Sequence, residues 1–336
     1  MQLRPFFVPM RHRFRRVTSR QGVLLGGPAG WGEFSPFPDY GPDIAATWLR
    51  AAREAATEPF PAPVRDRVPV NTTVPAVDAA TAYDLVAASG CATAKVKVAE
   101  PGQQLVDDLD RVAAVRDALG AGGHVRVDAN AAWDVDTAAH ALERLDAAAG
   151  GLEYAEQPCA GLDELAELRR RIPVRLAADE SVRTAEDPLR IAGLAAADII
   201  VVKVQPLGGV WRALEVVQAA GLPAVVSSAV ETSVGLAAGV ALAAALDELP
   251  HACGLGTATL LAGDLTDRPL VPVAGEIGVR RVEPDPAHLD QWTPDPETAL
   301  ALLDRMQSAD DAGRSEDAGR SDGGGGSDGG STGTPT

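Results

Sequence analysis

Short apolar runs alternate with longer alanine- and leucine-rich segments over residues 68–262. The short runs are rich in β-branched residues and predict buried strands, whereas the longer segments have the composition of helices. The predicted strands are Val68–Thr73, Ala94–Val98, His124–Asp128, Leu152–Glu156, Val174–Asp179, Ile199–Val204, Ala224–Ser228 and Cys253–Thr257. The predicted helices are Val77–Ala88, Leu105–Leu119, Thr137–Ala149, Asp163–Arg171, Pro188–Ala195, Val210–Ala219 and Ser233–Leu249. This alternation predicts an α/β protein with a TIM-type (β/α)7β barrel, and an open doubly wound sheet is the structural alternative.

The segments on either side of the barrel predict a smaller second domain. Residues 1–35 have the pattern of an antiparallel meander with turns at Ser19–Gly22 and Gly26–Gly30, and a helix is expected at Asp43–Ala56. After residue 262 the chain is Pro-rich and irregular, and a short helix is expected at Pro296–Gln307. We therefore expect residues 1–67 and 263–308 to form a small α+β capping domain around a barrel of residues 68–262. Residues 309–336 are rich in Asp, Gly and Ser, and we expect them to be a disordered tail.

Composition and charge exclude some classes of partner and indicate the compartment. The formal net charge of −17 argues against nucleic acid as a partner, and no apolar run approaches the roughly 20 residues of a membrane span. Cys91, Cys159 and Cys253 are far apart and odd in number, which fits a reducing cytoplasm rather than a disulfide framework or a zinc site. The first 20 residues hold six arginines and no acids, but they lack the apolar core of a secretory signal. We expect a cytoplasmic location. An oligomer is not predicted, and a monomer is favoured.

Lysine is rare in this chain, and its positions are informative. Of 30 Lys plus Arg residues, 27 are arginine and three are lysine: Lys95, Lys97 and Lys203. Lys95 and Lys97 lie one residue apart in a predicted strand, so they point to the same face, and Lys203 lies in another predicted strand. Arginine stays protonated, whereas a buried lysine can give and take protons. The plain alternative is three long side chains that lie in strands by chance, and the pattern favours positions where chemistry needs an amine.

Three predicted strands end in a carboxylate: Asp128, Glu156 and Asp179. The spacings of 28 and 23 residues each correspond to one βα unit, and the carboxyl ends of barrel strands meet at one face. Carboxylate oxygens suit a hard cation, so the sequence predicts Mg²⁺ there, before Ca²⁺ and with Mn²⁺ as a substitute. Mg²⁺ on a substrate carboxylate would make the neighbouring α-proton more acidic by stabilising the enediolate, and a lysine on either side could act as base or acid.

These residues resemble the active-site pattern of the enolase superfamily, whose members stabilise an enediolate on a metal, over about residues 1–305. The segment Gly30–Pro36 (GWGEFSP) is similar to the superfamily's cap-domain motif. The resemblance implies that Asp128, Glu156 and Asp179 hold the metal. It also implies that Lys97 transfers protons on one face of the substrate, with Lys203 opposite and Lys95 tuning Lys97. By the same resemblance Asn130 and Glu180 orient the ligands and the lysines.

The last two strand ends distinguish reactions within the superfamily. Residues 226–233 lack the histidine of the mandelate racemase branch, and residues 254–257 lack the Asp-x-Asp pair of dipeptide epimerases. A glycine-rich rim with hydroxyl groups suits a substrate whose second anion is held by hydroxyls and backbone N–H groups. The residues expected to contact such a substrate are Ser227, Ser228, Gly254, Gly256 and Arg20. Arg20 is expected to reach over the barrel mouth from a turn of the cap, and a solvated loop position is the alternative.

Taken together, the pattern resembles the o-succinylbenzoate synthases of menaquinone biosynthesis, in their actinobacterial type. This resemblance implies an Mg²⁺-dependent lyase in which Lys97 removes the α-proton of a cyclohexadiene carboxylate and returns it to the departing hydroxide. Racemisation of N-acylamino acids is the first alternative, and muconate cycloisomerisation is the second. An alternative of another class is a non-catalytic barrel that binds a phosphorylated ligand at Gly208–Gly209 and Gly254–Gly256.

Overall fold

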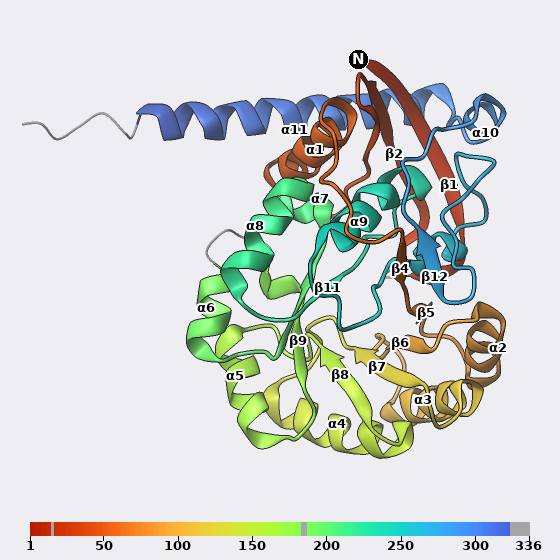
Figure 1. Cartoon of the computed structure of the whole chain (residues 1–336), viewed down its shortest axis with the longest axis vertical. Helices are drawn as coiled ribbons and strands as arrows, with labels where there is room; N and C mark the ends of the chain where they lie inside the picture. The colour runs from red at the N-terminus through yellow and green to blue at the C-terminus, as the bar shows by residue number, and fades with distance from the viewer. Residues whose placement is uncertain (15–16, 183–186, 323–336) are drawn as a thin grey trace, which may run out of the picture.

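A seven-stranded parallel sheet forms the centre of the computed structural model, which describes residues 1–14, 17–182 and 187–322 (Figure 1). The strands, in their order across the sheet, are β5 (Thr72–Val74), β6 (Thr93–Lys97), β7 (His124–Asp128), β8 (Leu152–Glu156), β9 (Leu176–Ala178), β10 (Ile199–Val202) and β11 (Ala224–Val226). Cys253 and Gly254 join the two edges, because the Asn71 N–H donates to the Cys253 carbonyl (2.9 Å) and the Gly254 N–H donates to the Val226 carbonyl (2.8 Å). The sheet is therefore closed into a barrel, and the predicted fold class is confirmed.

Helices cover the outside of the barrel. They are α2 (Ala79–Ser89), α3 (Leu105–Leu119), α4 (Val135–Ala149), α5 (Leu162–Arg171), α6 (Asp187–Leu194), α7 (Val204–Leu207), α8 (Val210–Ala220) and α9 (Ser233–Ala245), with 3-10 turns η1 (Glu180–Val182) and η2 (Gly256–Leu260). In α4 a single apolar stripe, including Leu142 and Leu145, is buried, as expected for a surface helix. In α9 every residue from Ser233 to Ala244 is buried. This helix is apolar all round because it packs between the barrel and the cap.

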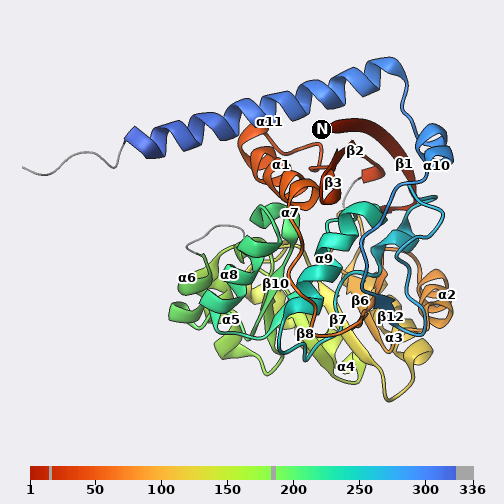
Figure 2. The ribbon, with the colours of Figure 1, turned by 45° about the horizontal axis from the view of Figure 1, so that its top comes forward.

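The smaller domain lies over one end of the barrel (Figure 2). Its N-terminal part consists of the antiparallel strands β1 (Gln2–Phe14), β2 (Val17–Gly27) and β3 (Gly30–Phe34), followed by α1 (Pro42–Thr57). The C-terminal part adds β12 (Glu276–Gly278), which pairs with β4 (Arg67–Pro69), and the helices α10 (Pro286–Gln291) and α11 (Pro296–Asp322). Helix α11 packs on α1, and the Phe7 N–H donates to the Trp292 carbonyl (2.8 Å). Both ends of the described chain therefore build the cap.

The core is continuous from the cap into the barrel. Phe6 and Val8 of β1 belong to the same buried apolar cluster as the outward-facing residues of the barrel strands. A separate cluster fills the barrel interior, and its members are Tyr154, Ala177, Ile199, Val201 and Val225. Among the described residues, no helix has both the length and the hydrophobicity that a bilayer crossing requires.

Three expectations about local structure were wrong. The run Val68–Thr73 is divided between β4, which pairs with the C-terminal segment, and β5, which belongs to the barrel. The segment Ser19–Gly22 lies inside β2 rather than in a turn. The run Cys253–Thr257 contributes bridges to both barrel edges and then enters η2, so it is not a regular strand.

The expected disordered tail is helical in its first part. Helix α11 continues to Asp322, and residues 323–336 lie outside the described residues. Ala309 is fully buried, and the Asp310 carboxylate pairs with Arg53 of α1 at 2.6 Å. The helix extends beyond residue 308 because α1 offers it these partners, which composition could not indicate.

Candidate active site

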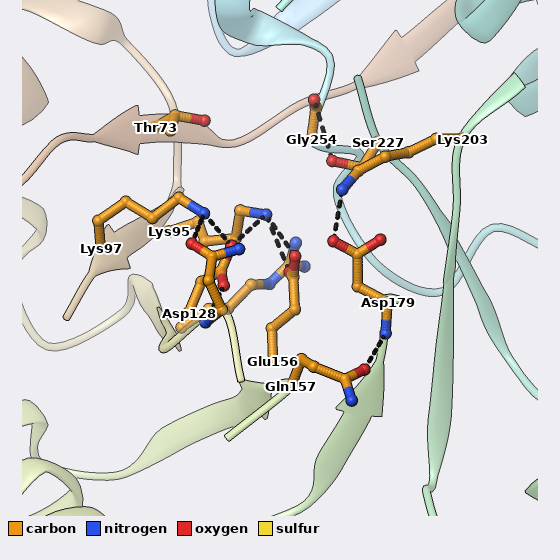
Figure 3. Close-up of polar contacts among 12 residues, drawn as sticks. Thr73, Lys95, Lys97, Asp128, Glu156, Gln157, Asp179, Lys203, Ser227 and Gly254 are labelled. Carbon is orange, nitrogen blue, oxygen red and sulfur yellow. Dashed lines mark hydrogen bonds and ion pairs between the residues drawn. The ribbon is translucent and has the colours of Figure 1, made fainter. Parts of the chain in front are cut away.

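The side chains of the candidate site come from one level of the barrel. Lys97, Asp128 and Glu156 occupy paired positions on β6, β7 and β8, so their side chains point into the barrel side by side (Figure 3). Asp179 follows β9 directly, and Lys203 follows β10 as the residue before α7. The register of the parallel strands therefore gathers residues that are far apart in sequence at the end of the barrel that faces the cap.

The carboxylates and the lysines pair with one another. Lys95 Nζ lies 2.8 and 2.9 Å from the two carboxylate oxygens of Glu156 and 3.2 Å from Asp128 Oδ2. Lys97 also donates to Asp128, and Lys203 donates to Asp179. All six side chains are at most 10% exposed. Each of these ionised groups therefore has a partner of opposite charge, which a buried charge requires.

Asp128, Glu156 and Asp179, with the lysines that pair with them, form a buried row of charges. Burial and the neighbouring charges move the pKa values in this row. Burial, and next the charge of Asp128, raise the pKa of Glu156 to about 7. Burial alone would also raise the pKa of Asp128, but Lys97 and Lys95 outweigh it and hold that pKa well below its usual range. For Lys95, burial is outweighed by Glu156 and Asp128, which raise its pKa. These two carboxylates therefore favour the protonated ammonium form of Lys95.

Polar neighbours hold the ends of this row. Asn130 Oδ1 accepts a hydrogen bond from Lys97 (2.6 Å), and its Nδ2 donates to Glu180 Oε1 (3.2 Å). Gln157 is fully buried, and its Oε1 accepts from the Asp179 N–H at 2.8 Å. Asn130 and Glu180 were expected here, whereas Gln157 was missed. Its position directly after Glu156 was the available signal, because residues at barrel strand ends face the active site.

Three carboxylates could hold a divalent cation, by the chemistry of the donor set. Asp128, Glu156 and Asp179 offer charged oxygens, which hard cations such as Mg²⁺ prefer. In the described part of the chain, however, no three Asp, Glu, His or Cys side chains are grouped closely enough to hold a metal ion as they stand. The Lys95 ammonium group lies between Asp128 and Glu156 instead, and Lys97 and Lys203 contact Asp128 and Asp179 (Figure 3).

A narrow cavity lies over the row, between the barrel and the cap. It is lined by Phe14 and Phe37 of the cap and, from the barrel, by Thr73, Lys95, Lys97, Asp128, Lys203, Ser227, Ser228, Ala229, Val230, Gly254 and Thr257. The Lys97 ammonium group lies 5.2 Å from the centre of the Phe14 ring. A second cavity of about 660 Å³ shares Phe14 and Lys97 with the first and extends towards Arg13 and Asn130. The site therefore adjoins a wider space on the Lys97 side.

The expected substrate contacts divide into two groups. Ser227, Ser228 and Gly254 line the narrow cavity, and the Ser228 hydroxyl lies 2.6 Å from that of Thr257. Gly256 does not line it and begins η2. Arg20 lies on β2, 1% exposed, and its Nε donates to the Val230 carbonyl at 3.1 Å. Arg20 thus supports the wall of the cavity and is not among the residues that line it.

Other lining residues were missed by the sequence analysis. Phe14 and Phe37 come from the cap, which has no motif for substrate contacts. Thr73 at the second position of β5 and Thr257 beyond the last barrel bridge could have been found by the same strand-end argument as the carboxylates.

Comparison with known proteins identifies similar sequences and folds. Residues 77–284 match the family described as Enolase C-terminal domain-like, and residues 6–56 match Enolase N-terminal domain-like. An o-succinylbenzoate synthase of Thermobifida fusca is 59% identical over 306 residues, which cover 91% of this chain and 96% of that protein. An o-succinylbenzoate synthase of Mycolicibacterium smegmatis is 55% identical, covering 84% of this chain and 87% of that protein.

Solved structures share the fold at low sequence identity. The L-Ala-D/L-Glu epimerase of Bacillus subtilis has a TM-score of 0.72 at 22% identity, covering 84% of this chain and 96% of that one. The muconate lactonizing enzyme of Pseudomonas putida has a TM-score of 0.72 at 20% identity, covering 87% and 98%. At this identity the likeness concerns the fold alone.

Proposed function

The chain belongs to the enolase superfamily and to its o-succinylbenzoate synthases, and from this premise we propose that it catalyses the reaction for which those relatives are named. The enzyme is then a lyase. It removes water from 2-succinyl-6-hydroxy-2,4-cyclohexadiene-1-carboxylate and gives 2-succinylbenzoate, in menaquinone biosynthesis. The observation that carries this proposal is the buried row of carboxylates with Lys97 and Lys203 on its two sides, below a cavity with hydroxyl-bearing walls.

Lys97 is the proposed proton carrier. In its neutral form it takes the proton from the ring carbon that bears the carboxylate, and it then gives this proton to the hydroxide that leaves the neighbouring carbon. The C–H and C–O bonds break, one water forms, and the ring becomes aromatic. Lys95, on the same strand and the same face, would tune Lys97 through the proximity of two like charges.

Asp128, Glu156 and Asp179 are the proposed ligands of Mg²⁺, with Mn²⁺ as a substitute. When bound, the cation supplies positive charge beside the substrate carboxylate and stabilises the negative charge that develops as the proton leaves. Gln157 and Asn130 would hold Asp179 and Lys97 in place through the hydrogen bonds described above. Lys203 would stand as a cation beside the ring on the opposite side.

Ser227, Ser228 and Gly254 are the proposed contacts of the succinyl chain, since they line the narrow cavity. Arg20 would influence the position of the succinyl group indirectly, because it holds the Val230 carbonyl in the cavity wall. We also propose the cytoplasm as the compartment, since the three cysteines are buried free thiols, as a reducing environment would leave them.

Racemisation of N-acylamino acids is the second candidate. It needs a proton carrier on each side of the substrate, and Lys97 and Lys203 approach from opposite sides of the row (Figure 3). Muconate cycloisomerisation ranks third. A phosphate-binding barrel has little support, because the Glu54 carboxylate already accepts a hydrogen bond from the Val210 N–H beside Gly208 and Gly209. A phosphate at this helix end would meet a like charge.

The test is a steady-state assay with the cyclohexadiene substrate and Mg²⁺, run beside an assay for α-proton exchange into N-succinyl amino acids. We expect rapid aromatisation that is lost with a chelator and in Lys97→Ala. Exchange without dehydration would move the proposal to the racemase. Retention of dehydration in a folded Lys97→Ala variant would contradict the proposed mechanism.

A further inference from the structure

Three carboxylates from outside the barrel strands lie at the N-termini of two neighbouring barrel helices. Glu54 of α1 accepts a hydrogen bond from the Val210 N–H of α8 at 2.5 Å. Glu33 of β3 accepts from the Thr232 and Gly235 N–H groups of α9, both at 3.1 Å. Asp264, from the C-terminal return, accepts from the Ser233 N–H at 3.2 Å. Negative charge is stabilised at the positive end of a helix, so these contacts tie the cap to the barrel.

Glu33 is nearly enclosed and serves several donors at once. It is 2% exposed, and it also accepts from the Ser35 hydroxyl (2.7 Å) and the Thr232 hydroxyl (2.5 Å). Both carboxylate oxygens are used by N–H or O–H donors. An amide in its place would turn an NH₂ group towards some of these donors and would leave buried N–H groups without an acceptor.

The segment that Glu33 holds is also a wall of the candidate active site. Residues 227–230 line the narrow cavity, and Thr232 is the N-cap of α9. Val230 has a φ of 63°, a left-handed conformation that is unfavourable for a β-branched residue. Such a conformation persists only where the surroundings enforce it. The two cap contacts are made at Val230 itself, by Arg20, and two residues later at Thr232, by Glu33.

Arg20 provides the contact at Val230. Its Nε donates to the Val230 carbonyl at 3.1 Å, and its Nη2 donates to the Ser35 carbonyl and to the Ser35 hydroxyl. The Ser35 hydroxyl in turn donates to Glu33. A single chain of hydrogen bonds therefore runs from Val230 through Arg20, Ser35 and Glu33 to Thr232, and every cap member of it is buried.

We propose that Glu33 and Arg20 are positioning residues, which hold residues 227–232 in the conformation that places Ser227 and Ser228 in the substrate cavity. The cap thus sets the shape of a barrel loop through buried hydrogen bonds. The effect on turnover rests on the proposed function, whereas the effect on the loop does not.

The experiment compares the wild type with Glu33→Gln by hydrogen–deuterium exchange and by steady-state kinetics. We expect amide exchange of residues 227–235 to rise by about tenfold or more, because buried donors lose their acceptor there, with little change in the barrel strands. The KM for the cyclohexadiene substrate should rise about tenfold and more than kcat falls, since the reacting lysines keep their partners. Arg20→Lys should act in the same direction, because a lysine cannot make the paired contacts. Ser35→Ala is the milder variant if Glu33→Gln does not fold.

Asp78→Asn is the matched control, since Asp78 also caps a helix, α2, by accepting from the Thr81 N–H at 2.9 Å, and it does not line the narrow cavity. It should leave exchange over residues 227–235 and the KM unchanged. Unchanged local exchange in Glu33→Gln, or a uniform rise over the whole protein, would overturn the proposal. If the wild type shows no synthase activity, the proposed function fails, and the exchange result still decides this inference.

Discussion

Lys95 and Glu156 form a buried ion pair in which one ammonium group donates to both carboxylate oxygens, at 2.8 and 2.9 Å. The two residues lie on β6 and β8, with β7 and its Asp128 between them. The same ammonium group reaches Asp128 at 3.2 Å. Lys95 therefore binds together two of the three carboxylates, and it is a fixed charge at the floor of the candidate active site.

Removal of that charge should destabilise the fold. We expect Lys95→Met to lower the free energy of unfolding by about 3 kcal/mol at pH 8, because it leaves buried carboxylates without a partner. Urea denaturation would measure the change. Lys95→Arg, which keeps the charge, is the control and should lose less. Equal stability of wild type and Lys95→Met would show that the ion pair does not contribute to stability.

The role of Lys97 can be separated from its charge. Lys97→Ala and Lys97→Arg should both lower kcat by about 10³-fold, because arginine keeps the positive charge but cannot release its proton. Single-turnover kinetics with folded variants, checked by circular dichroism, would measure this. Substantial activity in Lys97→Arg would mean that Lys97 acts as a cation and not as the proton carrier.

The proposed metal site predicts stabilisation by Mg²⁺. At a concentration of 100 times Kd, Mg²⁺ should raise the free energy of unfolding by about 2.7 kcal/mol, which corresponds to a Tm increase of a few degrees. Asp179→Asn should lose this increase. Asp198→Asn is the control, because Asp198 pairs with Arg169 at 2.6 Å away from the site. If Mg²⁺ raises the Tm of Asp179→Asn as much as it raises that of the wild type, Asp179 is not a ligand.

Glu33 should make stability depend on pH. Burial raises its pKa from 4.5 in the unfolded chain to about 7, and the facing groups are Thr232, Ser35, Glu231 and Arg20. Between these two pH values the folded state binds more protons than the unfolded state, so the contribution of Glu33 to stability falls as pH rises from about 4.5 to about 7. Above that pH it stays constant.

The measurement is the difference in free energy of unfolding between wild type and Glu33→Gln. This difference should fall by about 3 kcal/mol, the equivalent of the pKa change, across that pH range, because other titrating groups such as Glu156 cancel. A difference that does not vary with pH would contradict the raised pKa of Glu33.

The helical extension beyond residue 308 can be tested by truncation. We expect a chain that ends after Ser308 to have a Tm a few degrees below that of a chain that ends after Asp322, since it lacks the buried Ala309 and the Arg53–Asp310 ion pair. Differential scanning calorimetry would give both values. Equal Tm values would mean that this part of α11 adds nothing to the fold.

The sequence by itself determined the repeated βα units and the polar residues at their strand ends, whereas closure into a barrel was decided by the structure. Strands buried on both sides are continuous apolar runs, and a parallel barrel must bring their carboxyl ends to one face. The positions of Asp128, Glu156, Asp179 and the three lysines followed from this constraint alone. The family resemblance rested on the same few residues.

Only the tertiary structure decided what reaches the site from elsewhere in the chain. Phe14 and Glu33 lie on cap strands, and nothing local distinguishes a strand residue that contacts a barrel loop from one that faces solvent. Arg20 was expected at the barrel mouth, but its contact with the Val230 carbonyl was not. The extension of α11 likewise depends on α1, more than 250 residues earlier in the chain. Such contacts arise when separate segments pack together, and for that reason a periodicity read along one segment cannot contain them.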